Sequence, residues 1–139
     1  MTGMILISGG TGFVSRALTR RLNELGHEIR ILIRPSEKSP RLPLGIPVEV
    51  AVCSLNDPRG LRVAMKGVDT VFHLASSENT GNQADLMKVD IQGTENIAGA
   101  ARGAGVDRFY YLSHLGVDRA SAYPVLKAKA IAETHIRNS

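Results

Sequence analysis

The sequence has little of several features that other protein classes need. Cys53 is its one cysteine among 139 residues, so an internal disulfide framework is excluded and a reducing compartment is expected. Tryptophan is absent and aromatic residues make up 4%, too few for a stacking platform for nucleic-acid bases. No apolar run approaches the ~18 residues of a membrane-spanning helix, and the first apolar stretch is too short for a signal-peptide core. We therefore expect a cytoplasmic protein.

The rest of the composition is that of an ordinary globular chain, with 43% hydrophobic and 22% charged residues. Seventeen Lys and Arg against thirteen Asp and Glu give a net charge of +4. The basic residues are scattered along the chain, so no nucleic-acid partner is expected. No metal site is expected either. The length is that of one domain, at ~150 residues per domain.

Hydrophobic patterning predicts strands that alternate with helices. Short apolar or β-branched runs predict strands at Met4–Ser8, Glu28–Ile33, Val48–Val52, Thr70–Leu74 and Arg108–Leu112. Helices are expected from Val14 to Leu25, where Gly26 follows as a stop signal, and at Asp57–Met65, Gln83–Ala101 and from Ala122 onward. The expected apolar side of the first helix is formed by Val14, Ala17, Leu18, Leu22 and Leu25, and that of the long helix by Met87, Ile91, Thr94, Ala98 and Ala101.

The stretch from Pro35 to Pro47 holds four of the six prolines and is expected to be an extended loop. The order of the elements implies right-handed crossovers and a parallel sheet covered on both faces. The fold class is therefore α/β, a doubly wound Rossmann-type sheet of about five strands in the order 3-2-1-4-5.

A glycine-rich turn, Ser8-Gly9-Gly10-Thr11-Gly12-Phe13-Val14-Ser15, lies between the first strand and the first helix. A nucleotide pyrophosphate needs a close backbone and a helix N-terminus aimed at it, and Gly9 and Gly12 remove side chains that would block that approach. The candidate cofactor-binding residues here are Gly9, Thr11, Gly12, Phe13 and Val14. The alternative is a tight strand-to-helix turn without a ligand. A P-loop is excluded, because no Gly-Lys-Ser/Thr ends the motif.

This stretch resembles the Thr-Gly-x-x-Gly-x-x-Gly motif of the extended and atypical short-chain dehydrogenase/reductase superfamily. More narrowly, it is similar to NAD-dependent epimerase/dehydratase-like and NmrA-like proteins and to the related accessory subunit of respiratory complex I. Ser8 stands in place of the first threonine. Ser15 stands where the third glycine packs the helix against the strand, so its hydroxymethyl group is expected to shift the helix slightly.

Arg34 follows the second strand, where an NAD-binding protein usually has Asp or Glu for the ribose 2′-hydroxyl. An arginine instead binds a 2′-phosphate in fork geometry, so NADP is expected over NAD. Ser36, Lys38 and Arg41 are expected to add to the phosphate pocket. The alternative is that Arg34 begins a solvated loop.

The resemblance implies further cofactor contacts. Relatives often have Gly-Asp-Leu after the third strand, with the Asp on adenine, whereas this chain has Ser54 and then Leu55, so that contact is expected to be weakened. The backbone of Leu74-Ala75-Ser76 is expected to line the cofactor, while His73 is expected to pack at the strand end and not to catalyse. Asp90–Asn96 resembles the motif Asn-x-x-Gly-Thr-x-Asn.

Tyr123 and Lys127 match Tyr-x-x-x-Lys, and positions i and i+4 share one face of a helix. A lysine ~4 Å away at an effective dielectric of ~20 supplies the ~4 kcal/mol needed to bring a phenol into range as a general acid or base. The alternative is a surface pair. The resemblance implies that Ser113 orients the substrate oxygen, with His114 as an alternative polar partner, and that Lys127 also contacts the cofactor.

These residues favour an NADP(H)-preferring oxidoreductase or epimerase/dehydratase acting on a carbonyl, alcohol or nucleotide-sugar-like substrate. The alternative is a noncatalytic NADP(H)-binding sensor or assembly module. Residues 1–139 are expected to form the NAD(P)-binding domain, with the substrate-binding part absent. The fifth strand would then be a sheet edge that needs cover, and the helices Gln83–Ala101 and Ala122–Asn138 are candidates for a homodimer interface.

Overall fold

The computed structural model describes residues 3–9, 13–35, 45–74 and 91–111. Within them, a five-stranded parallel sheet runs in the order β3-β2-β1-β4-β5, which confirms the predicted fold class and strand order. The strands are β1 (Met4–Ser8), β2 (Glu28–Ile33), β3 (Glu49–Val52), β4 (Val68–His73) and β5 (Arg108–Tyr111). The helices are α1 (Phe13–Glu24), α2 (Pro58–Ala64) and α4 (Thr94–Gly103).

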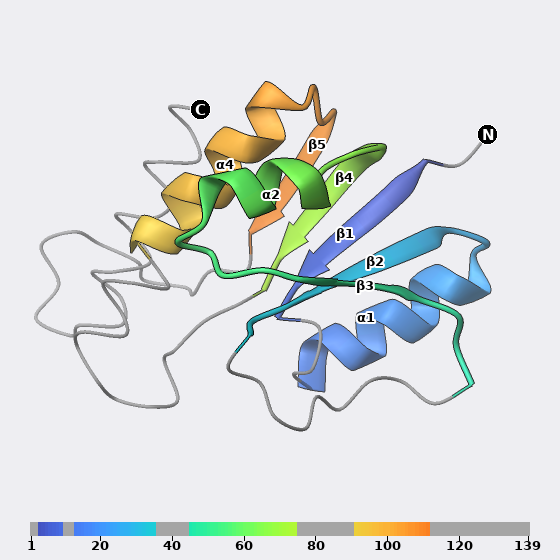
Figure 1. The fold of residues 1–139 in the computed structure, drawn as a ribbon. Coiled ribbons are helices and arrows are strands. Elements are labelled where there is room, and N and C mark those ends of the chain that lie inside the picture. The colour runs from blue at the N-terminus through green and yellow to red at the C-terminus, as the bar shows by residue number, and fades with distance from the viewer. Residues whose placement is uncertain (1–2, 10–12, 36–44, 75–90, 112–139) are drawn as a thin grey trace, which may run out of the picture.

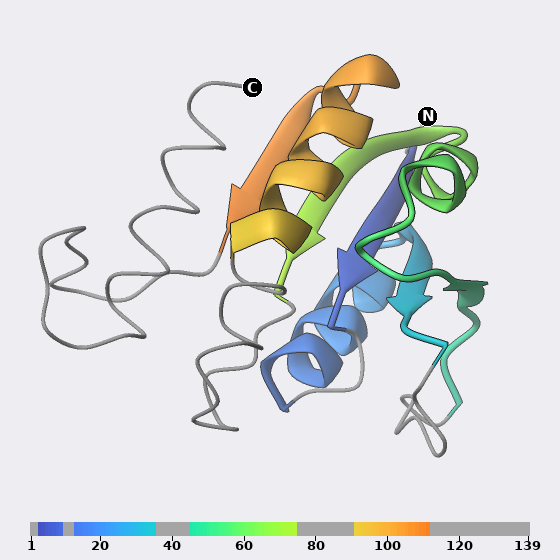
Figure 2. The same cartoon turned by 60° about the vertical axis from the view of Figure 1, so that its left-hand side comes forward.

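Helices cover both faces of the sheet, α1 on one side and α2 with α4 on the other (Figures 1 and 2). Successive side chains of a strand point to opposite faces. Ile5 and Ile7 of β1 therefore belong to the core under α1, whereas Leu6 between them belongs to the core under α2 and α4. Burial on both faces explains why β1 reads as a continuous apolar run.

Helix α1 buries only part of the side that its apolar spacing predicts. Leu22 is buried and Leu18 packs against the core as predicted, but Val14, Ala17 and Leu25 are exposed, and Ser15 and Thr19 are buried instead. The Thr19 hydroxyl donates to the Ser15 carbonyl over 2.7 Å, so its burial leaves that hydroxyl bonded within the helix. The predicted apolar stripe is wrong at Val14, Ala17 and Leu25, because short hydroxyl side chains can pack inward once their hydrogen bonds are made.

The strands and α2 lie within two residues of their predicted bounds, and α4 ends at Gly103, two residues after the predicted end of the long helix. Asp57 caps α2, its carboxylate accepting from the Gly60 amide over 3.2 Å, and Pro58 opens the helix as predicted. Strand β3 begins one residue later than expected, and β4 begins two residues earlier and ends one earlier. Helix α4 buries Ile91 beside it and, within it, Thr94, Ile97, Ala98 and Ala101. Residues 36–44, 83–90 and 112–139, which include most of the proline-rich loop and the expected last helix, lie outside the described residues.

Arg30 of β2 joins three elements on one side of the sheet. Its guanidinium donates to the carbonyls of Ala64 and Lys66 over 2.6 and 2.7 Å, at the C-terminal end of α2. It also pairs with Glu49 of β3 at 3.2 Å, and its side chain is 17% exposed. A cation at this end of a helix satisfies its last carbonyls and complements its dipole.

We expect Arg30→Ala to lower the free energy of unfolding by about 2 kcal/mol, because it removes two charge-assisted hydrogen bonds to carbonyls at the end of α2, one of them partly buried. The measurement is urea denaturation followed by circular dichroism. The control is Arg21→Ala, which removes an exposed ion pair with Glu24 on α1 and should change stability by less than about 0.5 kcal/mol. An equal loss of unfolding free energy in the two variants would show that the Arg30 hydrogen bonds stabilise the fold no more than an exposed ion pair does.

Burial, and to a lesser degree the nearby Asp57 carboxylate, raises the pKa of the Cys53 thiol above its ordinary 9.0. We expect this thiol to react with an aromatic disulfide reagent at pH 8 only as fast as the protein opens. Because the folded state holds the thiol proton more tightly than the unfolded chain, stability should fall as pH rises through and above 9.0, and Cys53→Ala should lose that part of the fall. Labelling of the native protein at the rate of a free thiol would contradict this.

Candidate functional site at the carboxyl ends of the strands

The order in which the chain adds strands to the sheet reverses between β1 and β4, and a glycine turn follows β1 at this switch point. From β1 the chain proceeds to β2 on one side, and β4 lies on the other. In open α/β sheets, the crevice beyond the strand ends at such a switch point is where ligands bind. Gly9 has a φ of +73°, a conformation that L side chains rarely adopt, and α1 begins at Phe13.

The N-terminal end of α1 is suited to an anion. Its first turn holds no acidic residue, and Val14 in that turn is half exposed. The first amides of a helix have no partner within the helix, and together with the positive end of the helix dipole they favour a negative group there. Of the predicted turn residues, Thr11 and Gly12 lie outside the described residues.

Ser15 has a definite place in this turn. It is 2% exposed, and its hydroxyl donates to the Gly9 carbonyl. Ser15, which stands in place of the expected glycine, therefore links the first turn of α1 to Gly9, the residue with the positive φ. Sequence reasoning treated Ser15 only as an intrusion, because the bond depends on a carbonyl six residues away.

A buried polar network lies directly under the glycine turn. Ser8 Oγ and His73 Nδ1 are 2.6 Å apart, and His73 Nε2 lies 2.9 Å from the Thr94 hydroxyl of α4. The Leu74 amide donates to both the hydroxyl and the carbonyl of Ser8 over 3.1 Å. All of Ser8, His73 and Thr94 are at most 1% exposed. This confirms that His73 packs at the strand end, as predicted.

Arg34 and the turn after β3 lie on the side of β1 that is away from β4. Arg34 directly follows β2 and is exposed, so a cation stands where a ribose-binding carboxylate would be expected. The Cys53 amide donates to the Ile33 carbonyl over 2.9 Å, which brings the chain after β3 beside the end of β2. Because the strands are parallel, the residues that follow them lie at one end of the sheet. These residues are Gly9, Arg34, Ser54 and Leu74.

The turn between β3 and α2 carries Ser54 and Leu55, both partly buried. The Asn56 amide donates to Ser54 Oγ over 3.1 Å, and the Asp57 amide donates to the Ser54 carbonyl over the same distance. The Asn96 amide group of α4 donates to the Leu55 carbonyl over 2.8 Å. Sequence reasoning noted Asn96 only as the last residue of a motif and assigned it no contact.

The remaining predicted site residues fall outside the described residues. They are Ala75 and Ser76 after β4, Ser113 after β5, and the Tyr123 and Lys127 pair. Among the described residues, no three His, Cys, Asp or Glu side chains lie close enough to hold a metal ion. No described helix is long and apolar enough to cross a membrane.

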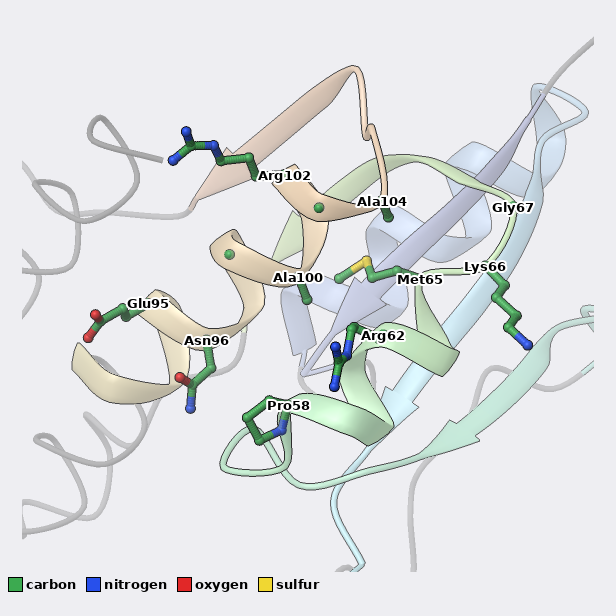
Figure 3. A pocket seen from close by; sticks show the side chains of 12 residues that line it. Pro58, Arg62, Met65, Lys66, Gly67, Glu95, Asn96, Ala100, Arg102 and Ala104 are labelled. Carbon is green, nitrogen blue, oxygen red and sulfur yellow. The ribbon is translucent and has the colours of Figure 1, made fainter.

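A groove separates α2 from α4 on the outer surface (Figure 3). It has a volume of about 1100 Å³, with Met65 and Ala100 between the two helices. Its charged lining residues are Arg62, Lys66, Glu95 and Arg102. Its lining includes Asn96 but none of the predicted cofactor-binding residues. The groove is therefore separate from the strand-end site.

Known proteins with similar sequences indicate what the site at the carboxyl ends of the strands binds in related chains. The model of a protein family described as NAD(P)H-binding matches residues 9–139. A 3-beta-hydroxysteroid dehydrogenase from Mycolicibacterium neoaurum is 32% identical over 117 residues, which cover 78% of this chain and 31% of that protein. The chain spans about a third of the length of the curated relatives it matches.

Solved structures have the same fold. A short-chain dehydrogenase/reductase superfamily protein from Agrobacterium tumefaciens with bound NAD is 29% identical and aligns with a TM-score of 0.77, over 97% of this chain and 44% of that one. The Bordetella bronchiseptica enzyme WbmG, in complex with NAD and UDP, is 25% identical with a TM-score of 0.81, over 100% of this chain and 50% of that one.

The strand order, the glycine turn at the switch point and these matches agree with the resemblance found in the sequence. The chain belongs to the family described as NAD(P)H-binding, and a short-chain dehydrogenase/reductase superfamily protein is among the structures that it resembles.

Proposed function

We propose that these residues form the cofactor-binding domain of an oxidoreductase or epimerase/dehydratase that prefers NADP(H). The observation that carries the proposal is the pairing of an anion-suited turn at Gly9 with a cation, Arg34, at the end of the neighbouring strand. A dinucleotide has a pyrophosphate for the first, and NADP alone has a 2′-phosphate for the second.

The described residues fit such a cofactor. The first turn of α1 offers backbone amides and no carboxylate to the pyrophosphate. Arg34 offers a guanidinium fork to the 2′-phosphate, whereas it has no acceptor for a free ribose hydroxyl. Ser54 and Leu55 border the adenine side, and Leu74 begins the segment on the nicotinamide side.

Chemistry at the nicotinamide end is assigned to Tyr123 and Lys127. The bound nicotinamide supplies a hydride donor or acceptor. The Tyr123 phenol gives a proton to, or takes one from, the substrate oxygen, and the Lys127 ammonium lowers the energy of the phenolate. Ser113 donates a hydrogen bond to the same oxygen. The substrate class we propose is a small carbonyl or alcohol, or a nucleotide-sugar-like molecule.

The cofactor preference is tested by Arg34→Ala. We expect wild-type protein to bind NADPH at least about 10-fold more tightly than NADH, and the variant to lose most of this difference while NADH binding changes little. The measurement is fluorescence titration with each nucleotide. The control is Arg21→Ala, at the other end of α1, which should leave both affinities unchanged. Tighter binding of NADH by the wild type would refute the role of Arg34.

The catalytic assignment is tested by Tyr123→Phe in the full-length gene product. We expect kcat with a carbonyl substrate to fall by about 10²- to 10⁴-fold, because the general acid is removed, while NADPH affinity stays the same. The control is Tyr110→Phe, which alters an exposed tyrosine of β5 stacked on Phe72. Tight NADPH binding without turnover by the wild type would favour a noncatalytic sensor or assembly role.

A further inference from the structure

Asn96 connects two parts of the chain that sequence order keeps apart. It lies in the first turn of α4, and its side-chain amide donates to the Leu55 carbonyl, 41 residues away, over 2.8 Å. Leu55 lies in the turn between β3 and α2. Two residues earlier on the same turn of α4, Thr94 contacts His73 at the end of β4. The first turn of α4 thus contacts two strand-end segments at once.

The β3–α2 turn has its own internal bonds, but they are local. Ser54 accepts from the amides of Asn56 and Asp57, and Asp57 accepts from Gly60. These bonds give the turn its shape. Its position relative to the sheet is set at one end by the Cys53 amide on the Ile33 carbonyl and at the other by Asn96 on Leu55.

The position of this turn matters for a dinucleotide. If the pyrophosphate lies at Gly9 and the 2′-phosphate at Arg34, the cofactor runs from β1 across β2 toward β3. The adenine then lies beyond the ends of β2 and β3, against Ser54 and Leu55. The Ser54 hydroxyl oxygen already accepts the Asn56 amide, and its hydrogen is still a possible donor to an adenine ring nitrogen, which accepts such a bond.

We propose that Asn96 is a positioning residue for the adenine half of the cofactor, acting through the Leu55 carbonyl and not by contact with the nucleotide. This inference rests on the proposed function, because it takes the dinucleotide to lie along the strand ends. It goes beyond it by assigning a role to a helix outside the predicted site.

A purely structural role for Asn96 makes a different prediction. Loss of one partly buried hydrogen bond would then lower stability and change the binding of every ligand alike, or of none. A positioning role changes only ligands that carry adenine, because the pyrophosphate contacts lie on β1 and α1. Probes with and without adenine therefore separate the two.

The test measures three probes by calorimetry: NADPH, adenosine 2′,5′-bisphosphate and inorganic pyrophosphate. In Asn96→Ala we expect both adenine-bearing probes to bind about 3- to 10-fold more weakly, the effect of one hydrogen bond, while pyrophosphate binding stays within about 2-fold. Asn96→Asp keeps the size of the side chain but faces the Leu55 carbonyl with an oxygen, so it should lose at least as much. Glu95→Gln, an exposed neighbour on α4, is the matched control and should bind all three probes as the wild type does.

Amide hydrogen exchange without any nucleotide gives a second readout. Loss of the Asn96 contact should speed exchange at Asn56 and Asp57 while β1 and β2 keep their protection. Should Asn96→Ala fold poorly, Asn96→Asp provides the same comparison.

Unchanged affinity for the adenine-bearing probes, or an equal loss for pyrophosphate, would overturn the inference and leave the proposed function standing. A wild-type protein that binds neither NADPH nor adenosine 2′,5′-bisphosphate would overturn the proposed function itself, and the inference with it.

Discussion

The candidate site depends on how the carboxyl ends of β1 and β4 are held together at the switch point, where the strand order reverses. Ser8 does this from the interior: its hydroxyl and carbonyl accept the Leu74 amide, and the same hydroxyl pairs with His73. Thr94 continues the network into α4. Polar groups buried this deeply are stable only when their hydrogen bonds are made, so the three segments are held in one arrangement. The glycine turn follows Ser8 along the chain, and the segment after β4 follows His73, so both begin at residues of this hydrogen-bond network.

The packing of α1 follows from the same requirement. Ser15 and Thr19 face inward with their hydroxyls bonded to backbone carbonyls, so they occupy positions that a helix of this kind normally gives to apolar residues. The Ser15 hydroxyl also holds the N-terminal turn of α1 beside Gly9, through its hydrogen bond to the Gly9 carbonyl. The polar face of α1 is thus part of how the site is built.

Much of the fold could be predicted from sequence, because strands buried on both faces read as short apolar runs such as Met4–Ser8, and capping residues such as Asp57 mark helix starts. The glycine turn and Arg34 could be placed for the same reason, since each directly follows a strand. The inward face of α1 could not, because a serine bonded to a carbonyl and a serine exposed to water look alike in a sequence. The bonds of Asn96 to Leu55 and of Arg30 to the end of α2 also escaped prediction, since each joins residues more than 30 positions apart. Tyr123, Lys127 and Ser113 keep the standing of predictions, because they lie outside the described residues.

The Arg30 contacts also affect how the molecule opens. One guanidinium binds the last carbonyls of α2 and the Glu49 carboxylate on edge strand β3, although these segments lie 34 and 19 residues from it along the chain. An edge strand and a short helix would each be expected to fray independently. Since both are attached to the same side chain on a central strand, the release of either weakens the attachment of the other. The Arg30 side chain therefore couples the opening of β3 to the opening of α2, two segments that have no covalent reason to open together.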